Sequence, residues 1–328
     1  MIEHLEQIGF YTLCDDRAKN VSYCSPLYRA ELLVCSACSF KCPYCRGLKP
    51  ELQGDIPFDK AKYILDLWIK DHLKNVRFSG GEPTLYPYLN DLVKISEEGN
   101  IEHIAISTNG SASFDLYEKL INSGVNDFSV SLDACCSSYG DKMAGVAGKW
   151  DIVVENIKRL AKRVYTTVGV VLTEDNIAQT SDIVKFADSL GVSDIRVIPA
   201  AQFASKLTDG IEIPESILNK HPILRYRIAN LKEGKNVRGI GENDCHKCHL
   251  VKDDMAVAGG KSGNLFHYPC IIFFREGGKA IGEVSPAMRA ERFDWFKNHD
   301  TFKDPICSKN CLDACVAHCN KVEKLQKE

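Results

Sequence analysis

Residues 32–45 read LLVCSACSFKCPYC. The apolar start of this stretch is typical of a buried strand, and Cys35 falls within it. Three more cysteines follow in a loop, Cys38, Cys42 and Cys45, with the spacing C-x3-C-x2-C. Thiolates hold iron–sulfur clusters, normally four to a four-iron cubane, so three thiolates leave one iron open to a ligand that is not protein. Zinc would need a fourth ligand, and Cys35, the cysteine on offer, belongs to the strand instead.

Polar motifs recur further along the chain, each directly after an apolar run. Residues 79–83 read SGGEP, residues 106–110 read ISTNG, residues 129–133 read SVSLD and residues 195–199 read IRVIP. Taken singly, each of these is an ordinary strand that ends in a turn. Glycines allow a backbone to approach a ligand closely, and a carboxylate can accept hydrogen bonds from an ammonium group. Each motif therefore places polar residues or glycines at the end of an expected strand.

Strand-like and helical patterns alternate through the first two thirds of the chain. Apolar runs begin near Leu32, Val76, His103, Asp127, Thr166 and Asp194, and helical patterns occupy 58–70, 87–97, 114–122, 149–162 and 176–190. Gly124 and Gly191 stand where a glycine commonly ends a helix. Such alternation predicts an α/β fold with parallel strands. Six units fit a partial (β/α)6 barrel of the TIM type, in which functional residues gather at the carboxyl ends of the strands. A full eight-unit barrel is the alternative, but no seventh or eighth repeat is visible.

The composition limits the classes of function. The 328 residues are 45% hydrophobic and 26% charged, with a net charge of −3, which indicates a globular protein and gives no electrostatic support for binding nucleic acid. No run of eighteen apolar residues predicts a membrane span, and the first residues lack a basic and apolar export signal. Fifteen cysteines without such a signal read as metal ligands or buried thiols in a reducing cytoplasm rather than as disulfides. We therefore expect a cytoplasmic protein.

A second group of cysteines follows the βα repeats. We place the domains at 1–30 (an N-terminal extension), 31–210 (the barrel) and 211–328 (a cysteine-rich domain). The last range carries Cys245, Cys248, Cys270, Cys307, Cys311, Cys315 and Cys319. The spacing predicts a metal-binding domain with zinc as the alternative to iron–sulfur, since paired cysteines serve zinc equally well. The last four cysteines would line one face of a continuous helix, whereas a single cubane would require the backbone to turn.

The motifs of the first two thirds resemble those of the radical S-adenosylmethionine (radical SAM) enzymes. The resemblance rests on the cysteine loop with Tyr44 before its last cysteine, and on the four strand-end motifs over residues 32–199. It implies that Cys38, Cys42 and Cys45 hold a [4Fe–4S] cluster whose open iron binds S-adenosylmethionine, which is cleaved to a 5′-deoxyadenosyl radical that abstracts substrate hydrogen. It also implies a set of cofactor contacts: Tyr44, Gly80, Gly81, Glu82, Ser107, Asn109, Ser131 and Val197.

The later cysteines resemble the auxiliary-cluster regions of the SPASM/twitch enzymes and of the molybdenum-cofactor cyclase. The resemblance implies one or two auxiliary iron–sulfur clusters, although the spacing of Cys307 to Cys319 departs from the usual pattern and leaves the ligand sets open. Cys135 and Cys136, directly after the motif at 129–133, are candidate hydrogen-atom donors as in radical epimerases, or simply partly buried thiols. Residues 275–279 are expected to form a hairpin turn between strands.

Several functions remain open at this point. Oxidative C–H functionalisation of a peptide or small metabolite, by dehydrogenation or by bond formation, is the leading hypothesis, with a flavodoxin or ferredoxin as the expected electron donor. The short segment before the barrel predicts no leader-peptide domain. A nucleotide cyclase of the molybdenum-cofactor type is an alternative, although the terminal Gly-Gly of those enzymes is not found here. A radical epimerase is another, and a non-catalytic iron–sulfur or zinc module is the alternative from a different class.

Overall fold

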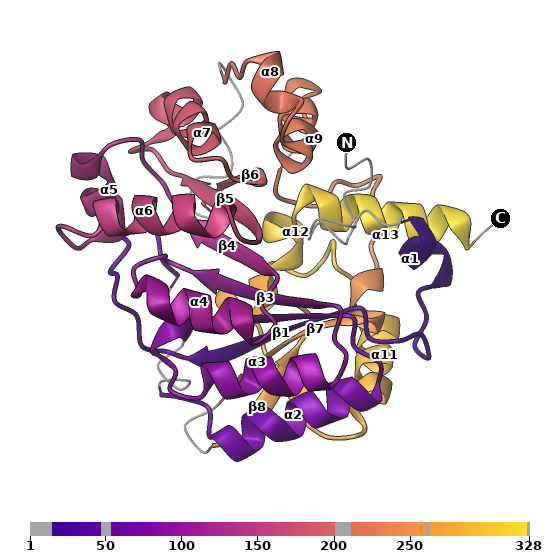
Figure 1. Cartoon of the computed structure of the whole chain (residues 1–328). Helices are drawn as coiled ribbons and strands as arrows, with labels where there is room; N and C mark the ends of the chain where they lie inside the picture. The colour runs from indigo at the N-terminus through magenta and orange to yellow at the C-terminus, as the bar shows by residue number, and fades with distance from the viewer. Residues whose placement is uncertain (1–14, 47–53, 201–210, 236, 260–262, 327–328) are drawn as a thin grey trace. The chain divides into compact units, whose positions relative to one another are not determined.

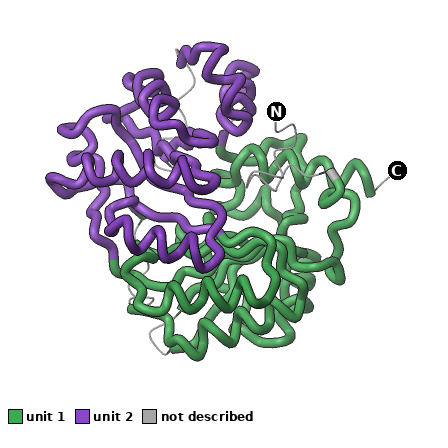
Figure 2. The backbone as a smooth tube through the Cα atoms, viewed as in Figure 1, with its two compact units in different colours: residues 1–37, 46–104, 238–328 green, residues 38–45, 105–237 purple. Residues whose placement is uncertain are grey.

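The computed structural model describes residues 15–46, 54–200, 211–235, 237–259 and 263–326. The chain falls into two compact units (Figure 2). Unit 1 combines residues 1–37, 46–104 and 238–328, and unit 2 combines residues 38–45 and 105–237. This partition interleaves the predicted domains 1–30, 31–210 and 211–328, whose division of the chain stays a prediction. Within the described residues, no helix has the length and apolar character that crossing a membrane requires.

Unit 1 is built on a sheet in which early and late parts of the chain are neighbours (Figure 1). Its strands follow the order β2-β1-β7-β8-β9. The strands are β1 (Arg29–Cys35), β2 (Asn75–Gly80), β7 (Asp254–Gly259), β8 (Leu265–Tyr268) and β9 (Gly282–Glu283). β1 pairs in parallel with β2 and with β7, whereas β7, β8 and β9 pair antiparallel. The cysteine-rich part of the sequence therefore contributes a seventh parallel strand that no repeat in the sequence predicts.

The helices of unit 1 bury apolar side chains against this sheet and against one another. They are α1 (Asp15–Asn20), α2 (Phe58–Lys70), η4 (Pro83–Leu85), α3 (Leu89–Glu98), η7 (His249–Lys252), α10 (Ile271–Arg275), α11 (Met288–Asn298), α12 (Cys307–Asn310) and α13 (Asp313–Leu325). One cluster joins Leu33 of β1 to Ala256, Tyr268 and Phe274, and another joins Ala18 and Val21 to Val322. Both ends of the sequence thus share one hydrophobic core.

Unit 2 repeats strand and helix in alternation. Its strand order is β3-β4-β5-β6, all parallel. The strands are β3 (His103–Thr108, which begins at the end of unit 1), β4 (Asp127–Ser131), β5 (Tyr165–Leu172) and β6 (Asp194–Pro199). The helices are α4 (Phe114–Asn122), α5 (Ser137–Ala144), α6 (Trp150–Ala161), η5 (Ile177–Gln179), α7 (Thr180–Ser189), α8 (Glu215–Leu218) and α9 (Pro222–Lys232). The predicted α/β class with six parallel strands is confirmed.

Most predicted boundaries are close to the observed ones, and two are wrong for identifiable reasons. The helix expected over 176–190 starts at Thr180 after the short turn η5, because the amide of Asn176 bonds the backbone of Thr173 and Val171 at the end of β5. Residues 275–279 are not a hairpin turn between strands. Arg275 is the last residue of α10, a helix that begins where the Cys270 sulfur accepts the N–H of Phe273.

Candidate functional site

The first cysteine loop belongs to unit 2 and presents its sulfurs outward. Cys38 and Cys45 are exposed and Cys42 is half-buried. The loop is fixed by the N–H of Lys41, which donates to the carbonyl of Ala144 at 2.8 Å. Gly145 allows this approach, because a Cβ there would meet the Lys41 carbonyl and its φ of 64° is unfavourable for other residues. A loop held by its backbone leaves its thiols available to a ligand.

Asn109, a predicted cofactor contact, lies beside this loop. Its amide nitrogen donates to the hydroxyl of Ser39 at 2.9 Å and to the sulfur of Cys38 at 3.8 Å. The N–H of Phe40 also donates to Cys38, at 3.4 Å. Hydrogen bonds to sulfur favour the thiolate, the form that binds metal. The strand end at β3 thus supports the cluster loop, while its predicted contact to S-adenosylmethionine stays a prediction.

Tyr44 of the loop is hydrogen-bonded to the buried carboxyl group of Asp133. The Tyr44 hydroxyl donates to one oxygen of Asp133, and the other oxygen accepts the N–H of Val171 at 2.6 Å. Burial raises the pKa of Asp133 to about 6 and the pKa of Tyr44 well above its ordinary value. The sequence placed Asp133 at a strand end without assigning it a role. Only the folded chain shows that it anchors the aromatic residue next to Cys45.

The glycine turn after β2 lies in unit 1, against the backbone that leads into the cysteine loop. Gly80 has a φ of 146°, and a Cβ on Gly81 would meet the carbonyl oxygens of Ala37 and Ser36. The N–H of Gly81 donates to the backbone carbonyl of Cys35 at 2.8 Å. Only glycine tolerates both the dihedral and the approach. The turn therefore needs its glycines for packing against its own unit.

Glu82 is buried and already serves the local backbone. Its Oε1 accepts the N–H of Thr84 at 3.1 Å and the hydroxyl of Thr84 at 2.6 Å, which caps η4. Its predicted contact with a cofactor ammonium group stays a prediction. A carboxylate oxygen can accept more than one hydrogen bond, so capping and cofactor binding are compatible.

The remaining predicted cofactor contacts lie on the parallel strands of unit 2. Ser107 is half-buried on β3, Ser131 is exposed at the end of β4, and Val197 is 1% exposed on β6. The ladders pair Ser131 with Gly169 and Val197 with Val170. These residues share one parallel arrangement with Asn109, and their contacts with a cofactor stay predictions.

The second cysteine field, defined as Cys245, Cys248, Cys270, Cys307, Cys311, Cys315 and Cys319, lies in unit 1. None of its members is exposed. Two precede η7, one begins α10, and the last four span α12 and α13. The backbone turns at Cys311, whose φ and ψ are −56° and 134°. The last four cysteines therefore do not line one continuous helix, and the turn that a shared cluster requires is present.

The sulfurs of this field interact in two close pairs. The hydrogen bond with Cys319, together with burial, raises the pKa of Cys248, and the hydrogen bond with Cys315 does the same for Cys311. The pKa of Cys315 is lowered because its sulfur accepts the hydrogen bond from Cys311 and because Arg29 is positively charged. Close thiols oppose one another's ionisation, and a bound metal ion removes that opposition. The field is therefore suited to a metal group.

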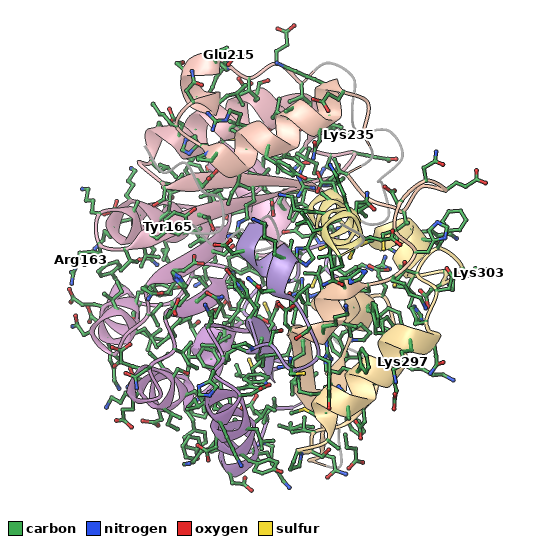
Figure 3. All side chains as sticks on the ribbon, turned by 90° about the vertical axis from the view of Figure 1, so that its right-hand side faces the viewer. Arg163, Tyr165, Glu215, Lys235, Lys297 and Lys303 are labelled. Carbon is green, nitrogen blue, oxygen red and sulfur yellow. The ribbon has the colours of Figure 1, made fainter. Side chains whose placement is uncertain are left out.

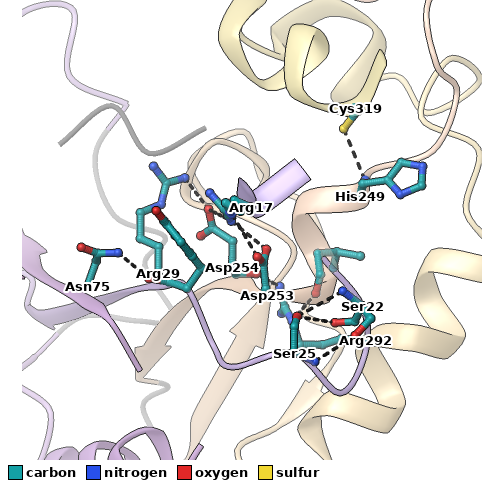
Figure 4. A network of polar contacts seen from close by, with 12 residues as sticks. Arg17, Ser22, Ser25, Arg29, Asn75, His249, Asp253, Asp254, Arg292 and Cys319 are labelled. Carbon is teal, nitrogen blue, oxygen red and sulfur yellow. Dashed lines mark hydrogen bonds and ion pairs between the residues drawn. The ribbon is translucent and has the colours of Figure 1, made fainter. Parts of the chain in front are cut away.

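Backbone N–H groups point at three sulfurs of the second field. Lys247 donates to Cys245 at 3.4 Å, His249 to Cys319 at 3.3 Å and Phe273 to Cys270 at 3.4 Å. Hydrogen bonds to ligand sulfurs orient them and tune the metal that they bind. Figure 4 shows the contact of His249 with Cys319 above a network of buried ion pairs.

The spacing of the sulfurs bears on which metal group they fit. A tetrahedral zinc ion with Zn–S distances of about 2.3 Å draws its ligand atoms within about 4 Å of one another. Among the residues that the structure describes, the one group of three ligand atoms all within 4.8 Å is His299, Asp304 and Cys307. No three cysteines of the described chain meet that limit. A single zinc ion bound by three or more of these cysteines would therefore require their sulfurs to move closer together.

Cys307 has a distinct polar environment. The ring nitrogen Nε2 of His299 lies 3.9 Å from its sulfur and 3.5 Å from Asp304. Trp295 stacks on the same ring with centroids 3.8 Å apart. The sequence analysis did not single out His299 as a candidate ligand. His299 lies eight positions before Cys307, a spacing that matches no short metal motif.

The comparisons with known proteins agree with this chemistry. The radical SAM superfamily matches residues 32–187. A probable GTP 3′,8-cyclase of Metallosphaera sedula is 23% identical over 180 residues, covering 54% of this chain and 56% of the relative. A GTP 3′,8-cyclase of Synechococcus elongatus is 25% identical over 215 residues, covering 60% and 65%. The chain thus matches a little over half of the length of these relatives.

Two solved structures show the same fold over most of the chain. Streptococcus suis SuiB bound to S-adenosylmethionine has a TM-score of 0.58 and 18% identity, covering 86% of this chain and 67% of that one. The structure of native anSMEcpe with bound AdoMet has a TM-score of 0.58 and 13% identity, covering 92% and 95%. At this identity the likeness establishes the fold, which includes the cysteine-rich part.

The donor set tests whether this chain suits the cofactors of that fold. The loop offers three thiols, of which Cys38 and Cys45 are exposed and Cys38 accepts hydrogen bonds from Phe40 and Asn109. Three thiolates can hold a four-iron cluster with one open position. The loop departs from β1, the strand that the glycine turn packs against. Residues 32–187 therefore form a domain of the radical SAM superfamily, whose cofactors are a [4Fe–4S] cluster and S-adenosylmethionine.

Proposed function

We propose that this chain is a radical SAM enzyme that oxidises an unactivated C–H bond of a peptide or a small metabolite, with one or two auxiliary iron–sulfur clusters in the second cysteine field. The cluster and S-adenosylmethionine together supply a 5′-deoxyadenosyl radical that abstracts hydrogen. The observation that carries the proposal is the presence of two separate sets of cysteines, one of three with two exposed members and one of seven with no exposed member.

The chain's own residues divide the work between the two sets. Cys38, Cys42 and Cys45 would hold the open cluster, and Asn109 would fix the Cys38 sulfur. Tyr44, held by Asp133, would keep the loop rigid beside Cys45. The second cysteine field would hold a group without an open face, which suits electron transfer better than ligand binding.

The oxidative outcome follows from electron bookkeeping. Abstraction of hydrogen leaves a substrate radical, and a second one-electron oxidation with loss of a proton yields a dehydrogenated or newly bonded product. An auxiliary cluster accepts that electron. A flavodoxin or ferredoxin is the donor that we propose for the first reduction. The structures that share the fold include one of SuiB with its precursor peptide and one of anSMEcpe with a peptide, which supports the peptide class of substrate.

The test is the iron and sulfide content after anaerobic reconstitution, with S-adenosylmethionine cleavage measured alongside. The wild type is compared with a Cys38/Cys42/Cys45→Ala variant. We expect the variant to lose cleavage and to keep about 4 irons per remaining cluster. An iron-free variant would assign the second field to zinc or to structure, and a wild type that never yields 5′-deoxyadenosine would reject an enzyme of this class.

A nucleotide cyclase is the second candidate, because the relatives named above carry that activity in their names. It predicts that GTP is consumed with S-adenosylmethionine and that it binds to the reconstituted protein. Incubation with GTP, followed by mass analysis of the nucleotide, separates this candidate from the oxidation of peptides or other metabolites.

A radical epimerase is a third candidate, and the two thiols after β4 support it unequally. Cys136 is exposed, and the hydrogen bond with Ser138 lowers its pKa. Cys135 is half-buried, and burial raises its pKa. A hydrogen-atom donor must keep its S–H bond, so Cys135 fits that role better. Turnover in deuterium oxide with Cys135→Ala and Cys136→Ala tests it, since loss of solvent deuterium from the product identifies the donor.

A further inference from the structure

Arg292 binds the backbone next to two cysteines of the second cysteine field. It belongs to α11 and is fully buried, at 0% exposure, whereas Lys297 of the same helix points outward in Figure 3. Its guanidinium donates to four backbone carbonyls: Nε to Val251 at 2.9 Å, Nη1 to Tyr268 at 2.8 Å, and Nη2 to Pro269 at 3.2 Å and to Asp254.

These carbonyls flank two cysteines that are far apart in the sequence. Val251 follows Cys248 by three residues, and Tyr268 and Pro269 immediately precede Cys270. A guanidinium is a rigid planar fork of donors. One side chain therefore fixes the distance between the backbone of the Cys248 loop and the backbone of the Cys270 loop.

The Asp254 carboxylate acts on the charge of Arg292 without forming a direct ion pair with it. In the part of the chain that the structure describes, its hydrogen bonds go to carbonyls and to His267, and no carboxylate forms an ion pair with it. The carboxylate of Asp254 is engaged instead by Arg29 at 2.6 Å and by Arg17 at 3.6 Å. Burial of an uncompensated charge is costly. A nearby negative charge is therefore needed to stabilise the buried Arg292 guanidinium.

Cysteines are among the anionic groups that act on this cation. Cys248 and Cys270 both act electrostatically on the Arg292 guanidinium, together with Asp254. Cys248 and Cys315 also act on Cys270, and Cys315 acts on Cys248. Thiolates that ligate a cluster carry net negative charge, which a permanent cation offsets. An arginine serves this purpose because it stays charged even when buried.

We propose that Arg292 is the positioning and counter-charge residue of an auxiliary cluster that includes Cys248 and Cys270 among its ligands. Its carbonyl contacts hold the two loops at ligand spacing, and its charge raises the reduction potential of the cluster. The inference rests on the auxiliary cluster proposed above. Reduction adds a negative charge, and a fixed cation nearby stabilises the reduced state. Such a cluster accepts an electron readily, as an oxidative reaction requires.

The experiment uses full-length protein in the Cys38/Cys42/Cys45→Ala background, so that all iron belongs to the second field. Arg292→Lys keeps the charge and loses the fork, and Arg292→Gln loses both. Arg289→Gln is the matched control. Arg289 lies one turn earlier on α11 and binds Asp71 at 2.6 Å and three carbonyls of residues 22–25, none of which belongs to the second cysteine field. Iron and sulfide per folded chain and an EPR-monitored redox titration are the readouts.

We expect Arg292→Lys to lower the iron content and to keep a potential close to that of the background protein. Arg292→Gln should lower the iron content further and shift the potential of the remaining cluster to a more negative value. Arg289→Gln should change neither. If Arg292→Gln does not fold, the loss of iron from Arg292→Lys relative to Arg289→Gln decides the positioning role.

Three results would overturn the inference or its basis, and they are distinguishable. Equal iron and equal potential in all variants would reject the role of Arg292 and leave the auxiliary cluster standing. An equal shift in Arg289→Gln would show a general effect of α11. A background protein without iron would reject the auxiliary cluster itself, before any Arg292 variant is compared.

Discussion

The two cysteine regions use the same side chain but differ in how far they expose it to solvent. The first loop, Cys38 to Cys45, exposes two of its three sulfurs and is held by backbone contacts from beneath. The second cysteine field exposes none, receives N–H groups at three sulfurs, and lies among buried arginines. An open position is useful only to a cluster that must bind a ligand. The difference teaches that exposure, more than cysteine count, separates a reactive cluster from an enclosed one.

The largest effect that we expect separates the two regions by function. Cys42→Ser should abolish 5′-deoxyadenosine formation, because a cluster with only two thiolates is not retained in the loop. Cys245→Ser should leave this cleavage detectable, because Cys245 belongs to the enclosed region. Chromatography of reaction mixtures measures the nucleoside. Cys24→Ser, at an exposed cysteine outside both regions, is the control, and equal loss in Cys245→Ser would end the division of roles.

The next effect concerns how the enclosed region is kept in place. Arg17 binds Asp253 through two hydrogen bonds of 2.9 and 2.7 Å, and both side chains are almost fully buried (Figure 4). Asp253→Asn should lower the free energy of unfolding by about 3 kcal/mol, because it leaves a buried cation with a weakened partner. Anaerobic urea denaturation measures it. Asp66→Asn, at the exposed pair with Lys62, should change stability little.

A third effect sharpens the comparison through pH. Burial, and then the charge of Arg292, lower the pKa of His267 to about 3 from 6.5. The unfolded chain therefore binds a proton that the folded chain refuses, so stability is present above pH 6.5 and is lost as the pH falls. Between pH 7.5 and 5 this residue should cost about 2 kcal/mol.

His267→Asn should remove that part of the pH dependence. The measurement is the unfolding free energy of the wild type and the variant at pH 7.5 and pH 5. His72→Asn, at an exposed histidine with a φ of 55° that asparagine tolerates, should keep the wild-type slope. A slope in His267→Asn that equals the wild-type slope would contradict the assignment.

The smallest effect tests whether Cys307 shares its metal with the other thiols. His299→Ala should leave most of the iron in place and change the EPR signal of the auxiliary cluster, because a contact to one ligand sulfur is lost. His246→Ala is matched, since His246 stacks on Phe302 at 4.5 Å in the same region. Loss of one non-iron metal ion without any change in iron would instead place Cys307 in a separate site with His299 and Asp304.

Local patterns were enough for the βα part of the fold. Strand starts at His103, Asp127 and Asp194 and the helix over 114–122 are predicted at the residues where they occur, because apolar periodicity there is not interrupted. Cys35 ends β1 as expected. The seventh parallel strand, Asp254–Gly259, was not predicted. It is a short buried run without a following helical repeat, so its partner is set by tertiary packing alone.

The site shows the same limit. The cysteine loop and its superfamily could be predicted from spacing, because metal ligation constrains neighbouring residues. The residues that position these cysteines could not be predicted from the sequence. Asp133 and Tyr44 are 89 positions apart, and Arg292 stands in a helix whose exposed and buried residues lack a clear stripe. Residues that position other residues leave no recognisable pattern in the sequence, because their contacts form only when the chain folds.

The pairing of β1 with β7 sets the order in which this protein can be completed during synthesis. Arg17 and Asp253 are 236 positions apart, and one edge of β1 has no partner until Asp254–Gly259 has left the ribosome. Contacts so distant in sequence form slowly, and an unpaired strand edge invites association with other chains. The first cysteine loop is therefore synthesised long before the strand that completes the sheet around β1. We expect cluster insertion at that loop to be a late step, after the carboxyl-terminal third has closed the sheet.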